Sequence, residues 1–285
     1  MSSKNFKKQI IKLLTFFIVP SALRRQAKRY LKFWFGLSPM KPETFLERYT
    51  YNKSQQDFIK KHIHDDIFSY RLVSLGCDCF SRTIPTLWGI KPRKKQGELG
   101  YPFDLSRHNI KSVVTALTHD FREYFDNLVF DQNLDSWVSD RGNIVYCHEP
   151  DCHENDKDKI ISRFSERIHN LRMILTEDTK PAIFICRYAP ELAPNGIDEV
   201  YDLYNLLYKT LEHYRQNRTF KLLLVDTFGR LDQKRLNPKI NFLSCPWLKQ
   251  PYVWHYDECR YSSQGLKFET LFINTILDLI KQSMC

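Results

Sequence analysis

Short apolar runs recur along the chain from residue 71 onward. Each holds five or six residues and is dominated by Leu, Ile, Val and Phe. Uninterrupted apolar runs of this length are typical of strands that are buried on both faces, as in parallel sheets. We therefore predict strands at 71–75, 143–147, 181–186, 220–225 and 240–244.

The segments between these runs have helical periodicity. In the clearest one, Ile160, Phe164, Ile168 and Leu171 recur at three- or four-residue spacing with charged residues between them. The pattern predicts helices at 110–118, 157–175, 198–216 and 264–282. Strands that alternate with helices predict an α/β fold, with a mostly parallel sheet covered by helices on both faces in three layers.

The N-terminal segment has a different character. Residues 1–35 contain nine Lys or Arg and no acidic residue, and the apolar run 10–20 is about eleven residues long, short of the ~20 that span a bilayer. We expect a basic amphipathic helix that lies on an anionic membrane surface, with Trp34 and Phe35 at the interface. An uncleaved signal-like segment and a basic helix docked on the body are the alternatives.

The domain organisation follows from these patterns. We expect a basic amphipathic segment at 1–38, a linker and lead-in helix at 39–69, and an α/β domain at 70–285. Pro39, Pro42 and the polar stretch as far as Gln56 are typical of a linker.

The net charge of +10 is concentrated at the N-terminus. Of the 43 basic residues, nine lie in 1–35, which leaves 34 against 33 acidic residues in the rest of the chain. A nearly neutral body argues against nucleic acid as a partner. The expected partner is the inner face of the cell membrane, reached from the cytoplasm.

The cysteines do not predict a metal site. The chain has eight of them, and several lie in apolar runs, where a reduced thiol behaves as a small apolar group. Cys77 and Cys79, Cys147–His148 and Cys152–His153 lack the spacings of common zinc sites. We expect no metal and no other cofactor.

The turn after the first predicted strand carries the clearest chemistry. The run ends at Gly76, and Asp78 and Cys79 follow just before an apolar segment, 80–88, that can start a helix. A thiol at a helix N-terminus has a lowered pKa and a larger fraction of nucleophilic thiolate. The alternative is a small buried cysteine under a tight turn.

Other chemistry-bearing residues follow the later strands. Because the carboxyl ends of parallel strands share one edge, which is where ligands bind, we expect these residues to meet there. Arg187 can bind a carboxylate or phosphate or form a structural ion pair. The residues after the later strands, in chain order, are His148, Glu149, Arg187, Asp226, Trp254, His255 and Asp257.

Three motifs now carry a resemblance to a known family. They are Val73-Ser-Leu-Gly-Cys-Asp-Cys79, Tyr101-Pro-Phe-Asp104 and Phe121-Arg-Glu-Tyr-Phe125. In this order they resemble a bacterial domain family of unknown function that is described as papain-like cysteine peptidases. The resemblance covers roughly 70–285 and extends to a strand that ends at His148, a helix with Arg163 and Arg167, and a strand that ends at Arg187. Leu105 replaces the family's tryptophan, and Cys77 is an additional thiol.

The resemblance implies a cysteine peptidase or a related acyl hydrolase or acyltransferase. Cys79 would be the nucleophile and His148 its base, with Asp104, Asp151 or Asp226 orienting the imidazole. Backbone N–H groups near Cys79 could form an oxyanion hole, and Gly76 and Asp78 would line the substrate site. Asp104 is equally suited to a turn or helix N-cap.

Two other functions remain open. Papain-like enzymes combine a helical lobe with an antiparallel barrel, whereas the predicted parallel sheet is similar to that of SGNH-type esterases and acetyltransferases. In that interpretation the segment Trp254–Gly265 matches the motif before the last helix that carries the catalytic histidine. Arg260 occupies the position of that histidine, so His255 would replace it. Trp254 and Asp257 would contact the substrate. Surface polysaccharide or a lipid-linked sugar would be the substrate. The third hypothesis is a non-catalytic binding or scaffold protein in which Cys79 is merely buried.

Overall fold

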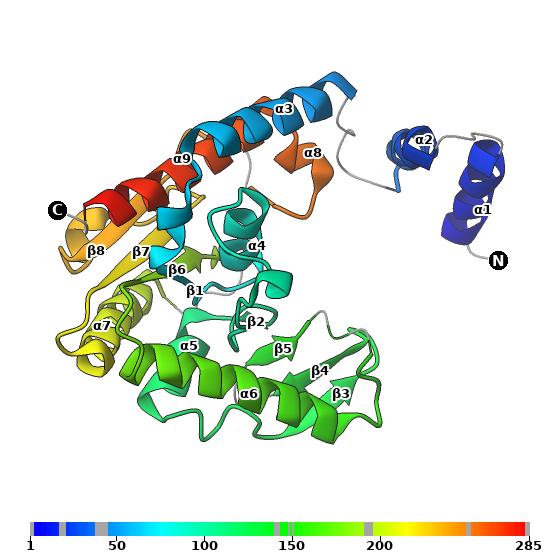
Figure 1. Cartoon of the computed structure of the whole chain (residues 1–285). Helices are drawn as coiled ribbons and strands as arrows, with labels where there is room; N and C mark the ends of the chain where they lie inside the picture. The colour runs from blue at the N-terminus through cyan, green and yellow to red at the C-terminus, as the bar shows by residue number, and fades with distance from the viewer. Residues whose placement is uncertain are drawn as a thin grey trace. The chain divides into compact units, whose positions relative to one another are not determined.

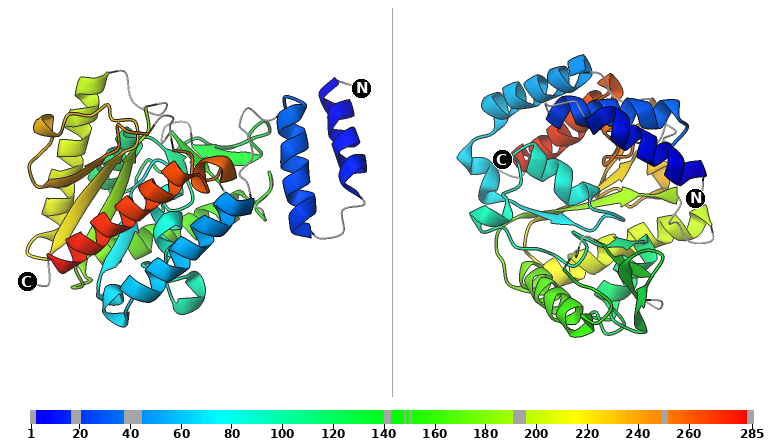
Figure 2. Two further views of the ribbon diagram at one scale, coloured as in Figure 1. Left: turned by 90° about the horizontal axis from the view of Figure 1, so that it is seen from above. Right: turned by 90° about the vertical axis from the view of Figure 1, so that its right-hand side faces the viewer.

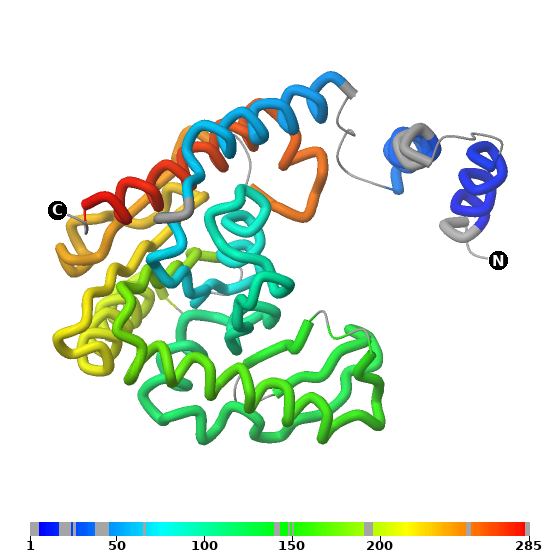
Figure 3. Tube along the Cα trace, in the orientation of Figure 1, coloured from blue at the N-terminus to red at the C-terminus, as the bar shows by residue number. Residues whose placement is uncertain are grey.

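A computed structural model describes residues 3–16, 21–37, 45–139, 143–147, 149, 151–190, 196–248 and 252–282 (Figure 3). The chain divides into two compact units, and each is described by itself. The N-terminal unit comprises 1–57 together with 252–268. The sheet unit comprises 58–251 together with 269–285 and holds both β-sheets.

The main sheet of the sheet unit is parallel (Figure 1). Neighbouring strands pair in the order β1-β6-β7-β8. Every residue of β6 is buried, as expected for a strand that is covered on both faces. This confirms the predicted α/β fold. The strands are β1 (Arg71–Ser74), β6 (Ala182–Tyr188), β7 (Phe220–Asp226) and β8 (Ile240–Ser244).

Helices cover both faces of this sheet and complete three layers. On one face, α5, α6 and α7 share an apolar core with Val73, Phe184 and Leu224 of the strands. On the other face, Phe80 of α4 packs on Phe272 of α9, with ring centroids 4.9 Å apart. The bounds agree with the predicted helices to within one residue: α4 (Phe80–Leu87), α5 (Ile110–Thr118), α6 (Lys157–Thr176), α7 (Ile197–Arg215) and α9 (Ser263–Lys281).

A second sheet is antiparallel, and the sequence did not predict it. Its order is β2-β5-β4-β3, so the apolar run 143–147, predicted to belong to the parallel sheet, forms β5 of the antiparallel one instead. The hairpin of β3 and β4 precedes β5 directly, and pairing with such a near neighbour costs little loop-closure entropy. The strands are β2 (Arg107–His108), β3 (Leu128–Asp131), β4 (Ser136–Ser139) and β5 (Ile144–Tyr146).

In the N-terminal unit, α1 (Ser3–Phe16) and α2 (Ser21–Trp34) lie side by side (Figure 2). The amphipathic segment is therefore a pair of helices and not one. A linker and a lead-in helix were expected at 39–69, and a helix is present there, because α3 begins at residue 45 and extends to 62. The polar stretch to Gln56 belongs to this helix and is not a linker. Residues 43–56 contain no Gly or Pro to interrupt a helix. Tyr51 of α3 is 1% exposed and packs on Tyr261, which directly follows α8 (Asp257–Arg260).

Short 3-10 helices connect the larger elements of the sheet unit. The segment η1 leads into β1, η2 precedes the Tyr101–Asp104 motif, and η4 lies between β7 and β8. Their bounds are η1 (Asp65–Ser69), η2 (Lys94–Gln96) and η4 (Gln233–Arg235).

Candidate functional site

The turn between β1 and α4 is tightly built. The N–H of Leu75 donates to Ile185 O at 2.8 Å, which continues the β1–β6 pairing beyond the end of β1. A Cβ atom at Gly76 would lie 2.5 Å from Ser81 Oγ and 3.3 Å from Ser81 Cβ. Glycine therefore lets the turn approach the first turn of α4 closely.

Asp78 links this turn to the end of β6. Its Oδ1 accepts a hydrogen bond from the Phe80 N–H at 3.0 Å, at the start of α4. Its Oδ2 lies 3.1 Å from Nη2 of Arg187, whose side chain is 7% exposed. The predicted meeting of Asp78 and Arg187 at the carboxyl edge of the sheet is thus present, as a largely buried ion pair.

Cys79 occupies the N-cap position of α4 and is 5% exposed. Burial raises the pKa of its thiol to about 12, and the nearby Asp78, Cys147 and Asp104 add to the rise, whereas Arg82 opposes it. The expectation that the helix N-terminus lowers this pKa is wrong, because removal of water from the thiolate outweighs the helix dipole. In this state the thiol is protonated at neutral pH.

The segment after β5 approaches Cys79 from the antiparallel sheet. Cys147 lies close enough to raise the pKa of the Cys79 thiol, and its own pKa is raised by burial. The Cys147 thiol donates to Val145 O at 3.6 Å. The predicted base, His148, follows Cys147 directly in the chain and lies outside the described residues.

Asp104 is a buried carboxyl group beside this thiol. It is 1% exposed, and its Oδ2 accepts a hydrogen bond from Tyr101 N at 2.9 Å and lies 3.5 Å from Arg82 Nε. Burial raises its pKa, although Lys91 and Arg82 act in the opposite direction. Among the described residues, its Oδ1 has no hydrogen-bond partner.

The other two motifs of the resemblance pack on each other in an aromatic core. Phe103 is fully buried, with its ring centroid 6.0 Å from that of Phe121 and 6.1 Å from that of Tyr124. The Tyr124 hydroxyl also donates to Pro102 O at 3.0 Å. This core fixes the backbone that presents Asp104 to Cys79.

Asp226, predicted as a catalytic carboxylate, holds a turn at the end of β7. Its two carboxylate oxygens accept four backbone hydrogen bonds of 2.7–3.0 Å, from residues 228–231. The side chain is fully buried. These bonds occupy the carboxylate, so we assign Asp226 to the architecture of the turn.

Trp254, His255 and Asp257 belong to the N-terminal unit. The imidazole of His255 packs between the rings of Trp254 and Tyr256, with centroid distances of 5.5 and 4.6 Å. Asp257 accepts a hydrogen bond from Arg48 Nη2 at 3.0 Å and also pairs with Arg29. In this unit, then, Asp257 serves as a partner for two arginines.

Arginines of α6 bind the acidic segment after β5. Arg163 Nη1 lies 2.7 Å from both Glu149 Oε2 and Asp151 Oδ1, and 3.4 Å from Cys152 Sγ. Arg167 Nη2 lies 2.7 Å from Glu149 Oε1. The acidic and thiol groups of Glu149, Asp151 and Cys152 are close enough to share a metal ion, but the Arg163 guanidinium occupies that position and supplies the balancing charge.

A polar pocket of about 480 Å³ lies beside these arginines and beside the charged neighbours of Cys79. Two residues of its wall, Arg82 and Asp104, are near enough to Cys79 to influence the pKa of that thiol. Pockets of 300–1,000 Å³ are the usual size for small-molecule sites. The polar residues of its wall include Arg82, Asp104, Glu149, Arg163, Arg167 and Asn170.

One buried imidazole near the turn was missed by the sequence analysis. His108 is 1% exposed, its backbone N–H donates to Cys77 O at 3.2 Å, and its Nδ1 lies 3.1 Å from Ser106 Oγ. Burial lowers its pKa to about 3, so the ring is neutral at neutral pH. In the sequence, the only indication that His108 belongs to the site was its position four residues after Asp104.

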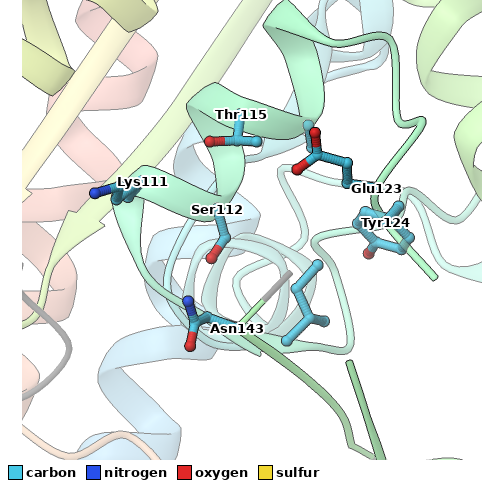
Figure 4. A pocket seen from close by; sticks show the side chains of 8 residues that line it. Lys111, Ser112, Thr115, Glu123, Tyr124 and Asn143 are labelled. Carbon is cyan, nitrogen blue, oxygen red and sulfur yellow. The ribbon is translucent and has the colours of Figure 1, made fainter. Parts of the chain in front are cut away.

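A second, smaller pocket of about 200 Å³ lies at α5 (Figure 4). Lys111, Ser112 and Thr115 line it from the helix, and Glu123 and Asn143 line it from other segments. It includes none of the predicted site residues, and its volume is below the usual range for ligand sites.

The comparisons with known proteins do not identify the chain. No family model matches it, and neither the curated proteins nor the solved structures contain a match.

Proposed function

We propose that the chain catalyses thiol-dependent acyl transfer, as a hydrolase or an acyltransferase, with Cys79 as the nucleophile and His148 as its base. The observation that carries the proposal is the position of Cys79. Its thiol lies at the N-cap of α4, after the first parallel strand, and close to Cys147, the residue that precedes His148. Two of its charged neighbours, Arg82 and Asp104, line a polar pocket. Ligands bind at this edge of parallel α/β sheets.

The raised thiol pKa determines how the reaction would proceed. With a pKa of about 12, only about one thiol in 10⁵ is ionised at pH 7, so a base must remove the proton as the sulfur attacks the acyl carbon. The new S–C bond replaces the bond to the leaving oxygen or nitrogen, which takes up that proton. Water or an acceptor hydroxyl then attacks the thioester, regenerating the thiol. Asp104 is the carboxyl group left for the orienting role, since Asp226 is bonded to its own turn and Asp151 is paired with Arg163.

The parallel order β1-β6-β7-β8 favours an esterase or acetyltransferase over a papain-like peptidase. The papain-like interpretation requires a helical lobe and an antiparallel barrel, whereas a nucleophile directly after the first parallel strand is similar to SGNH-type enzymes. Hydrolysis of peptide amides but not of esters would favour the peptidase, and a chain that binds ligand without any acyl transfer would be the scaffold protein.

Acyl-enzyme trapping tests the proposal. We expect p-nitrophenyl acetate to acetylate Cys79, detected by peptide mass spectrometry after acid quenching. The His148→Ala variant should acetylate about 100-fold more slowly, because general-base catalysis contributes at least that factor. The reaction is measured on the full chain near neutral pH.

Cys245 is the matched control for Cys79. It is also buried, and its thiol pKa is also raised to about 12. If Cys79 acetylates no faster than Cys245, or at the same rate in the His148→Ala variant, the pair has no catalytic activation and the enzyme proposal is wrong.

We also propose that α1 and α2 bind an anionic membrane surface. Phe6, Leu13 and Phe16 recur at helical spacing on α1 and are 58%, 68% and 68% exposed, respectively. Trp34 at the end of α2 is 80% exposed. Among the described helices, none is both long and apolar enough to cross a bilayer. Exposed apolar side chains among basic residues fit a helix that lies in the headgroup layer.

The substitution Phe16→Glu should lower vesicle binding by about tenfold, because insertion of one aromatic side chain contributes about 1.5–3 kcal/mol when it is complete. Co-sedimentation with vesicles of phosphatidylglycerol and phosphatidylcholine measures the change. Leu206→Glu, which alters an exposed leucine of α7, is the control and should bind like the wild type. Equal binding of all three proteins would contradict the membrane proposal.

A further inference from the structure

The basic residues of α2 gather on one side of the helix. Arg24, Lys28, Arg29 and Lys32 follow one another at helical spacing, and the helix contains no acidic residue. With 3.6 residues per turn, these four positions fall within a sector of about 140°. This basic face of α2 is the side of the helix that an anionic surface attracts.

One residue of the basic face already has a carboxylate partner. Asp257 of α8 pairs with Arg29 and also accepts a hydrogen bond from Arg48 Nη2 at 3.0 Å. The side chains of Arg29, Arg48 and Asp257 are 30%, 36% and 26% exposed, respectively, so water reaches all three. An ion pair at the surface stabilises the paired state by less than about fivefold in the equilibrium constant.

Arg48 would keep the carboxylate of Asp257 compensated after Arg29 leaves. Its guanidinium lies over the ring of Tyr261, with Cζ 4.3 Å from the ring centroid. This contact and the hydrogen bond to Asp257 do not involve α2. Removing Arg29 therefore leaves no unpaired carboxylate behind, which is the usual cost of breaking an ion pair.

We propose that Asp257 restrains the basic face of α2, and that an anionic membrane surface takes Arg29 away from it. The inference rests on the membrane binding proposed for α1 and α2. Near an anionic surface, each Lys or Arg contributes about fivefold to binding, which matches or exceeds the contribution of the ion pair. Arg29 exchanges the carboxylate for lipid headgroups, so the ion pair between α2 and α8 breaks on binding. Because this pair is lost, it lowers the affinity of the protein for the membrane.

Co-sedimentation of the full chain with vesicles of phosphatidylglycerol and phosphatidylcholine compares Arg29→Gln with Lys32→Gln. Lys32 is exposed on the same face and makes no ion pair with the residues that the structure describes. We expect Lys32→Gln to lower the affinity about fivefold. Arg29→Gln should lower it by less than about twofold, because it removes the ion pair together with the lipid contact. Equal losses in the two variants would overturn the inference.

The Asp257→Asn variant should have the opposite effect. It releases Arg29, so we expect about threefold tighter binding to the same vesicles. In this background Arg29→Gln should cost about fivefold, as Lys32→Gln does in the wild type. Glu258→Gln is the matched control, since it removes one negative charge from the next residue of α8, which forms no ion pair within the described part of the chain. If Asp257→Asn binds no more tightly than Glu258→Gln, Asp257 does not restrain α2.

Two further results separate this inference from the membrane proposal. A wild-type protein that does not bind the anionic vesicles would refute the membrane proposal and, with it, the inference. A wild-type protein that binds them, with equal losses for Arg29→Gln and Lys32→Gln, would refute the inference alone. On vesicles of phosphatidylcholine only, Asp257→Asn should bind like the wild type, and tighter binding there would contradict an exchange of Arg29 between charged partners.

Discussion

Replacement of Asp226 by alanine is expected to lower the free energy of unfolding by about 3–5 kcal/mol. The substitution removes the acceptor of four backbone N–H groups at the end of β7, and at least one of these groups is itself buried. Each buried N–H left without a partner costs about 1 kcal/mol or more. Urea unfolding followed by circular dichroism measures the difference.

The substitutions Asp226→Asn and Asp232→Asn are the companion and the control. An asparagine in place of Asp226 would turn an amide N–H toward backbone donors, so we expect a loss of about 2 kcal/mol. Asp232 is an exposed N-cap that accepts a single hydrogen bond from Lys234 N, and Asp232→Asn should change stability by less than about 0.5 kcal/mol. A stable Asp226→Ala protein that loses acyl transfer would restore the catalytic role of this carboxylate.

His108 is expected to make the protein unstable in acid. Its pKa is about 3 in the folded protein, against about 6.5 in an unfolded chain. Between these values the unfolded chain binds a proton that the folded protein does not, so stability falls as the pH decreases. The loss is about 1.4 kcal/mol per pH unit below 6.5, or about 3 kcal/mol at pH 4.

Urea unfolding at pH 7, 5 and 4 measures this effect. The His108→Gln variant should lose less stability with decreasing pH than the wild type. The difference should be about 1.4 kcal/mol per pH unit, which is the effect of one proton. His119→Gln is the control, because that imidazole is exposed to water on the surface of the protein. If His108→Gln and the wild type have the same pH dependence, burial of His108 does not cause the acid sensitivity.

Local sequence patterns were sufficient for most of the sheet unit. The runs at 71–75, 181–186, 220–225 and 240–244 form its parallel strands, and the four helices between and after them were predicted to within one residue. Strands buried on both faces must be apolar throughout, and helices at the surface must be apolar on one side only. Both requirements concern neighbouring residues, so a short stretch of sequence is enough to predict the strand or the helix.

The second sheet was not predictable in the same way. The run 143–147 is as apolar as the others, yet β5 pairs with β4 and not with a parallel strand. A signal was available in the turn-forming residues 131–135, which lie between two short runs rich in Val, Phe and Trp. Which partner a strand takes depends on the segments that compete for its edge, and this competition is not encoded in the strand itself.

The candidate site illustrates the same division. The Gly76–Cys79 turn, its place after the first parallel strand and the meeting of Asp78 with Arg187 follow from strand order, which the alternating pattern already implied. The protonation of Cys79 follows instead from Cys147, Asp104 and burial, which come from segments far apart in the chain. The pairing of Arg163 and Arg167 with Glu149 likewise joins α6 to the segment after β5. Charge and solvation are set by all neighbours in space, so they became defined only when the chain was folded.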